Sequence, residues 1–184
     1  MSDTDIINTA QQDFNCISKK RRILSLVLYI VITAVLTQID QITKYIAEQR
    51  LYNKPDFVII KDVLHLTYLR NNGSAFGMFS GKINAFLVLT VIMICLITYV
   101  VLKMPLIIKY IPVYITCILL AAGAIGNFID RVRFGYVRDF IYFKIINFPV
   151  FNVADCYVCV AAVLLIYCLL FRYKEEDFLW KKKN

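Results

Sequence analysis

The chain has 184 residues, of which 60% are hydrophobic and 18% are charged, against about 45–50% and about 25% in soluble domains. Too few polar side chains are present to cover a folded surface in water, which excludes a soluble enzyme. A net charge of +8 would suggest a nucleic-acid partner in a soluble protein. Here the basic residues flank apolar runs, which indicates membrane topology instead, and no nucleic-acid partner is expected.

Four uncharged runs follow one another along the chain, separated by charged residues. They cover residues 23–39, 83–102, 110–129 and 156–171. A helix needs about 20 mostly apolar residues to cross the hydrocarbon core, and the first and last runs reach this length if flanking residues join them. We therefore predict transmembrane helices near 23–46, 82–103, 107–130 and 153–172.

The first run follows the basic residues 19–22, as the apolar part of a signal peptide would. A polar tail precedes it, however, and no small-residue cleavage site occurs before Asp40, so we expect an uncleaved anchor. The sequence thus predicts a polar and basic cytoplasmic tail (1–22), a membrane domain (23–172) and a basic C-terminal tail (173–184) that contacts the anionic inner leaflet.

Basic residues beside the four runs gather on one side of the predicted membrane. They lie at 19–22, at both ends of the loop 103–109, and from 172 to 183. The positive-inside rule places this side, with both termini, in the cytoplasm. Two longer segments, 47–81 and 131–152, then lie outside, and the first is rich in β-branched and aromatic residues that predict a small sheet. The fold class is an all-α membrane protein with four transmembrane helices, a small extracytoplasmic β-rich segment and a second extracytoplasmic loop.

The polar residues near the predicted spans collect at the outer end, and no acid falls at mid-membrane. They are Asp40, Lys44, Asn71, Asn72, Gly73, Asn127, Asp130, Arg131, Asp139, Asn152 and Asp155. Two carboxyl groups that share a partly dry site do not both ionise easily, so their pKa values separate. An aspartic peptidase uses such a pair, one carboxylate to deprotonate a water and one carboxylic acid to polarise the scissile carbonyl.

Each of these polar groups also has a structural interpretation. Asp40 and Lys44 have the i, i+4 spacing of a helical ion pair. The polar residues at 127–131 could cap the end of the third helix, and those at 152 and 155 could cap the start of the fourth. Caps alone leave Asp139 without a role.

The cysteines and the single histidine add little chemistry. Cys156 and Cys159 form a CxxC motif, which in a soluble protein can bind metal or act in redox reactions. Within a long apolar helix they are better interpreted as small apolar fillers one turn apart. His65 is the only histidine and makes neither a catalytic triad nor a zinc site on its own. We expect no metal and no cofactor.

Five short motifs occur in order at the predicted outer ends of the helices and in the outer segments. They are Asp40-Gln-Ile-Thr-Lys44 (DxxxK), Asn71-Asn-Gly-Ser-Ala-Phe76 (NxGxAF), Gly126-Asn-Phe-Ile-Asp-Arg131 (GNxxDR), Tyr136-Val-Arg-Asp-Phe140 (VVDF) and Phe151-Asn-Val-Ala-Asp155 (FNxAD). Together they resemble the lipoprotein signal peptidases, the bacterial signal peptidase II family of aspartic peptidases. The resemblance spans roughly residues 23–172.

This resemblance implies a catalytic dyad of Asp139 and Asp155, a choice over Asp130 that the residues alone do not make. It implies substrate-binding or supporting roles for Asp40, Lys44, Asn71, Gly73, Asn127, Asp130, Arg131, Asn152 and Ala154. The implied substrate is a prolipoprotein whose cysteine carries diacylglycerol, cleaved just before that cysteine. The implied location is the bacterial cytoplasmic (inner) membrane, with the active site at the extracytoplasmic face. Contacts with membrane lipids and a monomeric state are expected.

The sequence departs from the family pattern at a few positions. Arg138 stands where an apolar residue is usual, and its charge would lower the pKa of Asp139 if it pointed inward. Ser74 stands where Ala is common and Cys156 where Ser is usual. The main alternatives to a peptidase are a four-span transporter and an assembly subunit. A transporter is disfavoured because no acid lies at mid-membrane, and a subunit would not need clustered acids.

Overall fold

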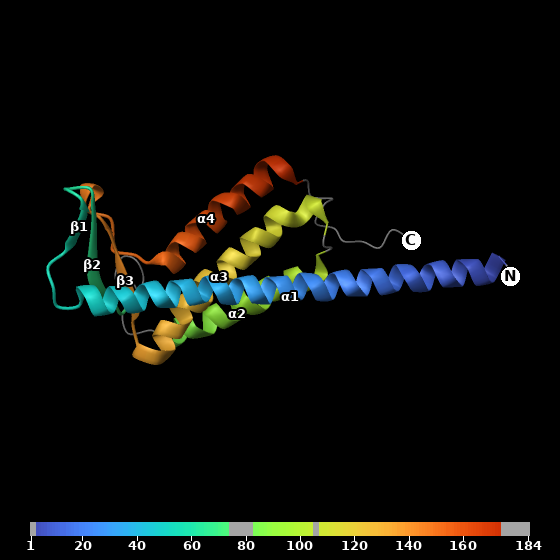
Figure 1. The fold of residues 1–184 in the computed structure, drawn as a ribbon, viewed down its shortest axis with the longest axis horizontal. Helices are drawn as coiled ribbons and strands as arrows, with labels where there is room; N and C mark the ends of the chain where they lie inside the picture. The colour runs from blue at the N-terminus through green and yellow to red at the C-terminus, as the bar shows by residue number, and fades with distance from the viewer. Residues whose placement is uncertain (1–2, 74–82, 105–106, 174–184) are drawn as a thin grey trace.

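The computed structural model describes residues 3–73, 83–104 and 107–173 and shows four long helices and one small sheet (Figure 1). The helices are α1 (Asp3–Leu51), α2 (Ile83–Lys103), α3 (Ile111–Phe134) and α4 (Val153–Tyr167). The strands are β1 (Phe57–Ile60), β2 (Leu64–Asn71) and β3 (Val137–Phe143). The sheet lies at one end of the helices, and the start of α1 and the end of α4 lie toward the other end.

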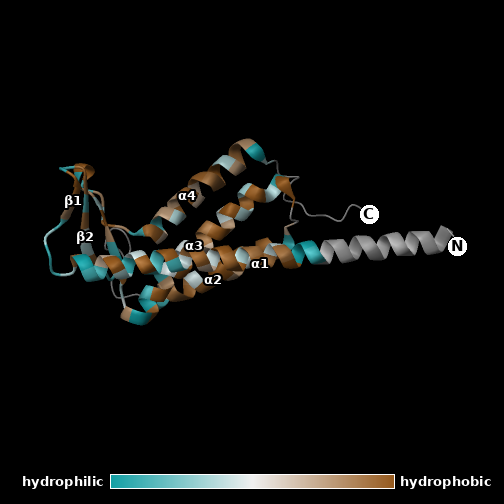
Figure 2. Cartoon of the chain, viewed as in Figure 1, coloured by the Kyte–Doolittle hydropathy of each residue, from teal (hydrophilic) through white to brown (hydrophobic). Residues whose placement is uncertain are grey.

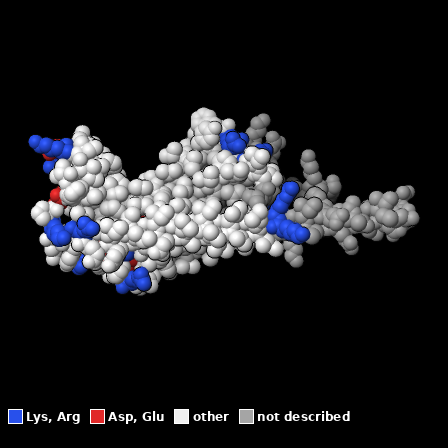
Figure 3. Space-filling view, viewed as in Figure 1, with Lys and Arg blue, Asp and Glu red and all other residues white. Residues whose placement is uncertain are grey.

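The four predicted membrane spans are confirmed. Helices long and apolar enough to cross a membrane cover Lys20–Leu51, Asn84–Lys103, Ile108–Phe134 and Val153–Arg172. The spans are mostly brown in Figure 2, and in Figure 3 the Lys and Arg side chains of the described residues gather at the sheet end and at the opposite end of the spans. The chain is therefore a multi-pass membrane protein. The cytoplasmic placement of the termini stays a prediction.

The helix boundaries differ from the predicted ones mainly at α1, which runs without a break from Asp3 to Leu51. The backbone helix thus includes most of the polar tail and extends past the predicted outer end. A 3₁₀ turn, Ile108–Tyr110, leads into α3, and a π-helical turn, Cys168–Arg172, continues α4.

The sheet joins the two predicted outer segments. Its strand order is β1-β2-β3 and both pairings are antiparallel. The strand pair predicted in 47–81 is confirmed, whereas β3 was not predicted within 131–152. Because Asn71 pairs with Val137 and Leu69 with Asp139, Asn71 and Asp139 lie diagonally on the same face of the sheet.

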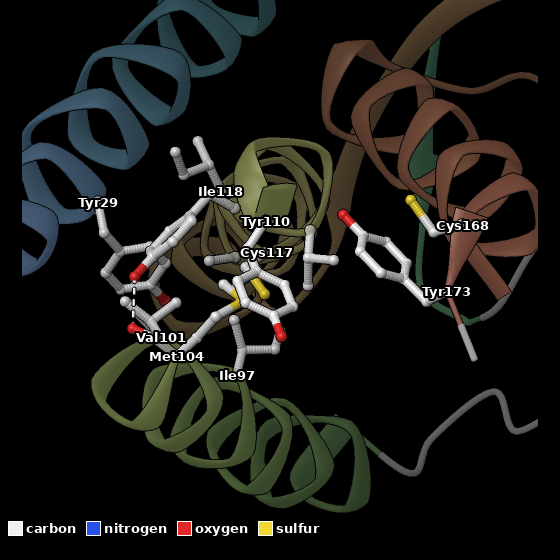
Figure 4. Close-up of a cluster of buried hydrophobic side chains, with 12 residues drawn as sticks. Tyr29, Ile97, Val101, Met104, Tyr110, Cys117, Ile118, Cys168 and Tyr173 are labelled. Atoms are coloured by element: carbon white, nitrogen blue, oxygen red, sulfur yellow. Dashed lines mark hydrogen bonds between the residues drawn. The ribbon is translucent and has the colours of Figure 1, made fainter. Parts of the chain in front are cut away.

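The main apolar core lies at the end opposite the sheet, where α1, α2, α3 and the end of α4 meet (Figure 4). Its residues are Tyr29, Ile97, Val101, Met104, Tyr110, Val113, Tyr114, Cys117, Ile118, Ala121, Cys168 and Tyr173. A smaller cluster of Ala47, Leu51 and Phe140 packs the end of α1 against the sheet. The sheet end therefore has little apolar core, and polar contacts carry much of its packing.

Two glycines on α3 allow three helices to meet beside the sheet. A Cβ atom at Gly123 would lie 2.6 Å from the carbonyl oxygen of Ala154, and one at Gly126 would lie 2.5 Å from Oδ2 of Asp40. A side chain at position 123 would require the backbone of α4 to move, and one at position 126 would displace the Asp40 carboxylate. The glycines thus bring α1 and α4 close enough to α3 for polar groups on all three helices to interact.

Candidate active site

The structure brings the polar residues predicted for the site together at the sheet end of the bundle. Asp40, Lys44, Asp130 and Asn152 are fully buried, and Asp139 is 1% exposed. Burial of so many polar groups is unfavourable unless each has a partner. Here the partners are of two kinds, namely cations and neutral amide or backbone N–H groups.

The predicted ion pair on α1 is confirmed, since Lys44 Nζ lies 2.9 Å from Asp40 Oδ2. Lys44 also donates a 2.8 Å hydrogen bond to Asn127 Oδ1 and lies 3.7 Å from Asp130 Oδ2. The other oxygen of Asp40 accepts a 2.9 Å hydrogen bond from the backbone N–H of Ala154. Asp40 thus satisfies one of the unpaired N–H groups in the first turn of α4, and the pair links α1 to both α3 and α4.

Asp130 on α3 binds Arg138 on β3. Its carboxylate accepts hydrogen bonds from Nε, one terminal nitrogen and the backbone N–H of Arg138, at 3.2, 2.8 and 2.9 Å. Burial lowers the pKa of Arg138, but the hydrogen bond and the charge of Asp130 outweigh it and the pKa is raised. We refer to Asp40, Lys44, Asp130 and Arg138 as the charge cluster.

Arg138 does not point toward Asp139, so the condition for its lowering the pKa of that carboxyl is not met. Successive side chains of a strand point to opposite faces, and Arg138 turns to Asp130 and to Glu48, 3.2 Å away on α1. Had a strand been recognised at 137–143, the opposite directions of successive side chains would have indicated this.

Asp139 is surrounded by neutral donors. Its Oδ2 accepts a 2.8 Å hydrogen bond from Asn71 Nδ2, and its Oδ1 a 2.6 Å hydrogen bond from Asn152 Nδ2. The amide of Asn71 is held in this orientation because its Oδ1 accepts a 3.0 Å hydrogen bond from the backbone N–H of Gly73. Burial, assisted by the charge of Asp155, outweighs these donors and raises the pKa of Asp139 to about 7.

Asp155 lies in the first turn of α4, where the predicted cap is present as a capping box. Asn152 Oδ1 accepts from the backbone N–H of Asp155 (3.1 Å), and Asp155 Oδ2 accepts from the backbone N–H of Asn152 (3.0 Å). Its Oδ1 accepts from Asn127 Nδ2 at 2.8 Å. The capping interpretation is confirmed, but it is not the whole role of Asn152, whose side chain also donates to Asp139.

The polar residues at 127–131 do not cap α3, which ends at Gly135 in the left-handed conformation, with its N–H bonded to the Arg131 carbonyl. Asn127 instead joins the two kinds of contact. Its Oδ1 accepts from Lys44 Nζ and from Asn152 Nδ2 (3.2 Å), which directs its Nδ2 toward Asp155. The guanidinium of Arg131 lies over the ring of Phe86 on α2, 4.8 Å from its centre.

A cavity of about 820 Å³ opens beside Asp139 and Asp155, between β3, the segment 146–151 and α4. Figure 3 shows a hollow in the surface between the sheet and the helices. Arg131, Asn71 and Gly73 also line the cavity, whereas most of its wall is apolar and comes from Val137, Phe143, Ile146, Phe148, Pro149, Val150, Phe151, Val158 and Val160. Such a mixture of a mainly apolar wall and a few convergent polar groups is typical of a binding site.

Two residues of the site were missed from the sequence. Gln41 donates to Asp40, Asp130 and the Gly126 carbonyl. Glu48 accepts from Arg138 and from Tyr68. Gln41, Lys44 and Glu48 are spaced by three and four residues, so a polar stripe on an otherwise apolar helix was the signal that could have revealed them.

Other candidates lie apart from the site or outside the described residues. His65 is buried in β2, with Nδ1 3.4 Å from Asp56, and Asn72 is exposed. Cys156 and Cys159 are free thiols beside the cavity. The motif residues Ser74–Phe76 and residues 174–184 of the predicted C-terminal tail lie outside the described part of the chain, whereas Tyr173 belongs to the main core. Within that part, no group of His, Cys, Asp and Glu side chains could hold a metal ion.

Fold and site together define a multi-pass membrane protein with two amide-bound carboxyl groups, the buried Asp139 and the half-buried Asp155, at one end of its helices. The sequence profile of the Signal peptidase (SPase) II family matches residues 32–171, and the chain belongs to this family of membrane peptidases.

Relatives and solved structures agree with this assignment. The lipoprotein signal peptidase of Caldanaerobacter subterraneus subsp. tengcongensis is 44% identical over 78% of this chain and 96% of its own length. That of Enterococcus faecalis is 41% identical over 79% of this chain and 89% of its own length. A bacterial membrane enzyme solved by the in meso method at 2.3 Å is 33% identical, with a TM-score of 0.68 over 85% of this chain and 93% of its own.

Proposed function

We propose that the chain is an aspartic endopeptidase that removes signal peptides from diacylglyceryl-modified prolipoproteins and cuts just before the lipidated cysteine. The observation that carries the proposal is the arrangement around Asn152. This one residue donates to Asp139 through its side chain and to Asp155 through its backbone N–H, so two carboxyl groups are held side by side at the cavity. The relatives named lipoprotein signal peptidases support the same activity.

The two carboxyl groups differ in environment, which assigns their roles. With a pKa of about 7, Asp139 keeps its proton up to neutral pH and is the general acid. Asp155 accepts one hydrogen bond from the side-chain amide of Asn127 on α3 and one from the backbone N–H of Asn152. It lies in the first turn of α4, a position that favours a negatively charged side chain. Asp155 is therefore the general base.

The reaction then proceeds by acid–base catalysis on a water molecule. Asp155 removes a proton from the water while the water oxygen attacks the scissile carbonyl carbon. Asp139 gives its proton to the carbonyl oxygen. Asp155 next gives the proton that it has gained to the leaving nitrogen, and Asp139 regains a proton as the carbonyl reforms. No metal or cofactor takes part.

The apolar wall of the cavity suits the acyl chains of the lipidated cysteine. Phe148, Phe151 and Val158 line the cavity. Arg131 offers a guanidinium to the peptide carbonyl groups, and Asn71 and Asn127 keep the carboxyl groups in place. Gly73 holds Asn71, and Ala154 receives the support of Asp40. A site at the end of the helices lies at the depth where a signal peptide, itself a membrane helix, ends.

The location follows from the charge distribution. Arg21, Arg22, Lys103 and Lys109 flank the spans at the end opposite the site, which supports a site at the extracytoplasmic face of the bacterial cytoplasmic membrane. All the side chains assigned to the reaction come from one chain, which supports an active monomer.

The test is cleavage of a diacylglyceryl-modified prolipoprotein by the purified chain in detergent. We expect activity in the natural sequence and a loss of at least about 10²-fold in Asp139→Asn and in Asp155→Asn. Asp62→Asn is the matched control and should retain full activity, because Asp62 is exposed and, among the described residues, pairs with Lys144 alone. Thermal unfolding checks that each variant is folded.

Near-normal turnover in either dyad variant would overturn the dyad, and Asp130→Asn would then be compared. Equal cleavage of the same prolipoprotein without its lipid would overturn the substrate assignment. A folded natural chain that cleaves neither form would contradict the proposed activity itself.

A further inference from the structure

A second groove, of about 540 Å³, lies between the end of α1 and the sheet. Its lining includes the apolar side chains of Ile46, Leu51, Phe57 and Phe140, together with Arg50 and Lys54. Phe140 is next to Asp139 in β3, so alternation places it on the opposite face of the strand. The groove is therefore separate from the cavity beside the carboxyl pair.

An exposed apolar stripe on α1 leads along the membrane span into this groove. Val35, Ile39, Ile42 and Ile46 are 53%, 44%, 48% and 51% exposed, and their spacing of four, three and four residues places them on one helical face. Arg50 follows Ile46 by one further turn. The stripe from Val35 to Ile46 rises about 16 Å, close to the roughly 15 Å thickness of one leaflet of the hydrocarbon core.

The two cations that line the groove, Arg50 and Lys54, differ in their partners from the buried cations nearby. Lys44 and Arg138 are buried in ion pairs. By contrast, Arg50 and Lys54 form no ion pair within the described residues. Two free cations at the upper end of an apolar stripe complement an anionic headgroup joined to acyl chains.

We propose that this groove binds an anionic glycerophospholipid of the outer leaflet. One acyl chain lies along the stripe from Val35 to Ile46, and the phosphate lies between Arg50 and Lys54. Because the groove is walled by α1 on one side and by the sheet on the other, the bound lipid also holds α1 against β3.

The test uses the full chain reconstituted in phosphatidylcholine bilayers that contain a small amount of spin-labelled phosphatidylglycerol or phosphatidylcholine. Electron paramagnetic resonance measures the motionally restricted fraction of each label. We expect phosphatidylglycerol to be preferred by up to about 25-fold, since each basic residue near an anionic headgroup contributes about fivefold. Arg50→Gln/Lys54→Gln should lose most of this preference.

Two further variants make the result specific to the groove. Lys61→Gln/Arg133→Gln removes the same charge from exposed residues outside it and should keep the preference. Thr43→Phe fills the groove, which Thr43 lines, while both cations remain, and it should lower the preference.

Three outcomes would overturn the proposal. They are equal restriction of the two labels by the natural chain, an equal loss in the Lys61/Arg133 variant, and an unchanged preference in Thr43→Phe. The measurement needs no peptidase activity, so it stands or falls separately from the proposed function.

Discussion

Arg138 and Asp139 are neighbours in β3, yet they belong to two buried polar regions of different construction. In the charge cluster, Asp40 and Asp130 each face a cation within 2.9 Å. Around Asp139 and Asp155, the hydrogen-bond donors are amide and backbone N–H groups. The two regions meet at Asn127, which accepts from Lys44 and donates to Asp155.

The difference separates structural from chemical use of a buried carboxyl group. A cation stabilises the ionised form and so fixes the protonation state, whereas a neutral amide fixes the orientation at a smaller electrostatic gain. Burial can then raise the pKa of Asp139 to about 7, which leaves its proton available for transfer. The cations of the charge cluster hold the helices and the sheet together, whereas the amides around Asp139 leave its carboxyl group able to titrate.

The largest expected effect comes from replacing Asp by Asn in each of the two regions, which should lower activity in one region and stability in the other. Asp139→Asn should lower kcat by about 10²–10⁴-fold. It should lower the free energy of unfolding by only about 1–2 kcal/mol, because the new amide NH2 faces one neutral amide donor and no cation loses its partner. Asp130→Asn should instead lower the free energy of unfolding by about 3 kcal/mol, because Arg138 loses its buried partner. Turnover and thermal unfolding in detergent are measured for both, and a strongly destabilised Asp139→Asn would contradict the distinction.

Lys44→Met tests how much of the stability contributed by the charge cluster depends on one cation. Asp40 loses its partner, and buried pairs broken in this way cost about 3–5 kcal/mol. The measurement is the midpoint of thermal unfolding, with Lys54→Met as the exposed control on the same side. An unchanged midpoint would show that Asp40 and Asp130 do not need Lys44.

The pH dependence sharpens the comparison because Asp139 is the group left free to titrate. Its pKa in the folded protein is raised, so the folded state binds more protons than the unfolded state between about pH 4 and 7. The stability contributed by this group therefore falls as pH rises through that range, at up to about 1.4 kcal/mol per pH unit. Activity should fall above about pH 7, as Asp139 loses its proton.

Asn71→Ala should move that alkaline limb to higher pH, because the hydrogen bond from Asn71 lowers the pKa of Asp139. The exposed neighbour provides the matched control, Asn72→Ala. The pH–kcat profile is measured for both, and a limb that stays in place or moves to lower pH in Asn71→Ala would contradict the assignment of Asp139 as the acid.

The smallest effect is expected at the edge of the charge cluster. Glu48→Gln removes the charge opposite Arg138 but keeps an acceptor for Tyr68, and Arg138 retains Asp130. We expect a loss of about 0.5–1 kcal/mol in the free energy of unfolding, as for other partly exposed pairs. A double-mutant cycle with Arg138→Met measures the coupling energy between Glu48 and Arg138. A coupling energy above about 2 kcal/mol would show that Glu48 contributes as much as a member of the charge cluster.

Much of this arrangement is predictable from the sequence because lipid imposes a simple rule on helices. Charges mark the ends of the apolar runs, so all four spans were recognised. The third strand was not, because residues 137–140 are all buried. A strand covered on both faces lacks the alternation of polar and apolar residues that reveals a strand at a surface.

The contacts of the site likewise divide into those that the sequence predicts and those that it does not. The Asp40–Lys44 pair and the Asn152–Asp155 capping box are local and follow from their spacing. The contacts of Asn127 with Lys44 and Asp155, or of Asp40 with Ala154, join residues far apart in the chain. They depend on how closely the helices approach at Gly123 and Gly126, and periodicity along one helix carries no information about that approach.

Both members of the Asp40–Lys44 pair lie on α1, and this bears on how the protein is made. During synthesis α1 emerges before α3 and α4, so neither Asp130 nor the Ala154 N–H is yet available. Charged side chains in a lone helix oppose insertion into the bilayer, but a pair one turn apart can neutralise itself. The first helix can thus enter the membrane with two members of the charge cluster already paired. Asp130 and Arg138 join the cluster when the later segments have been made.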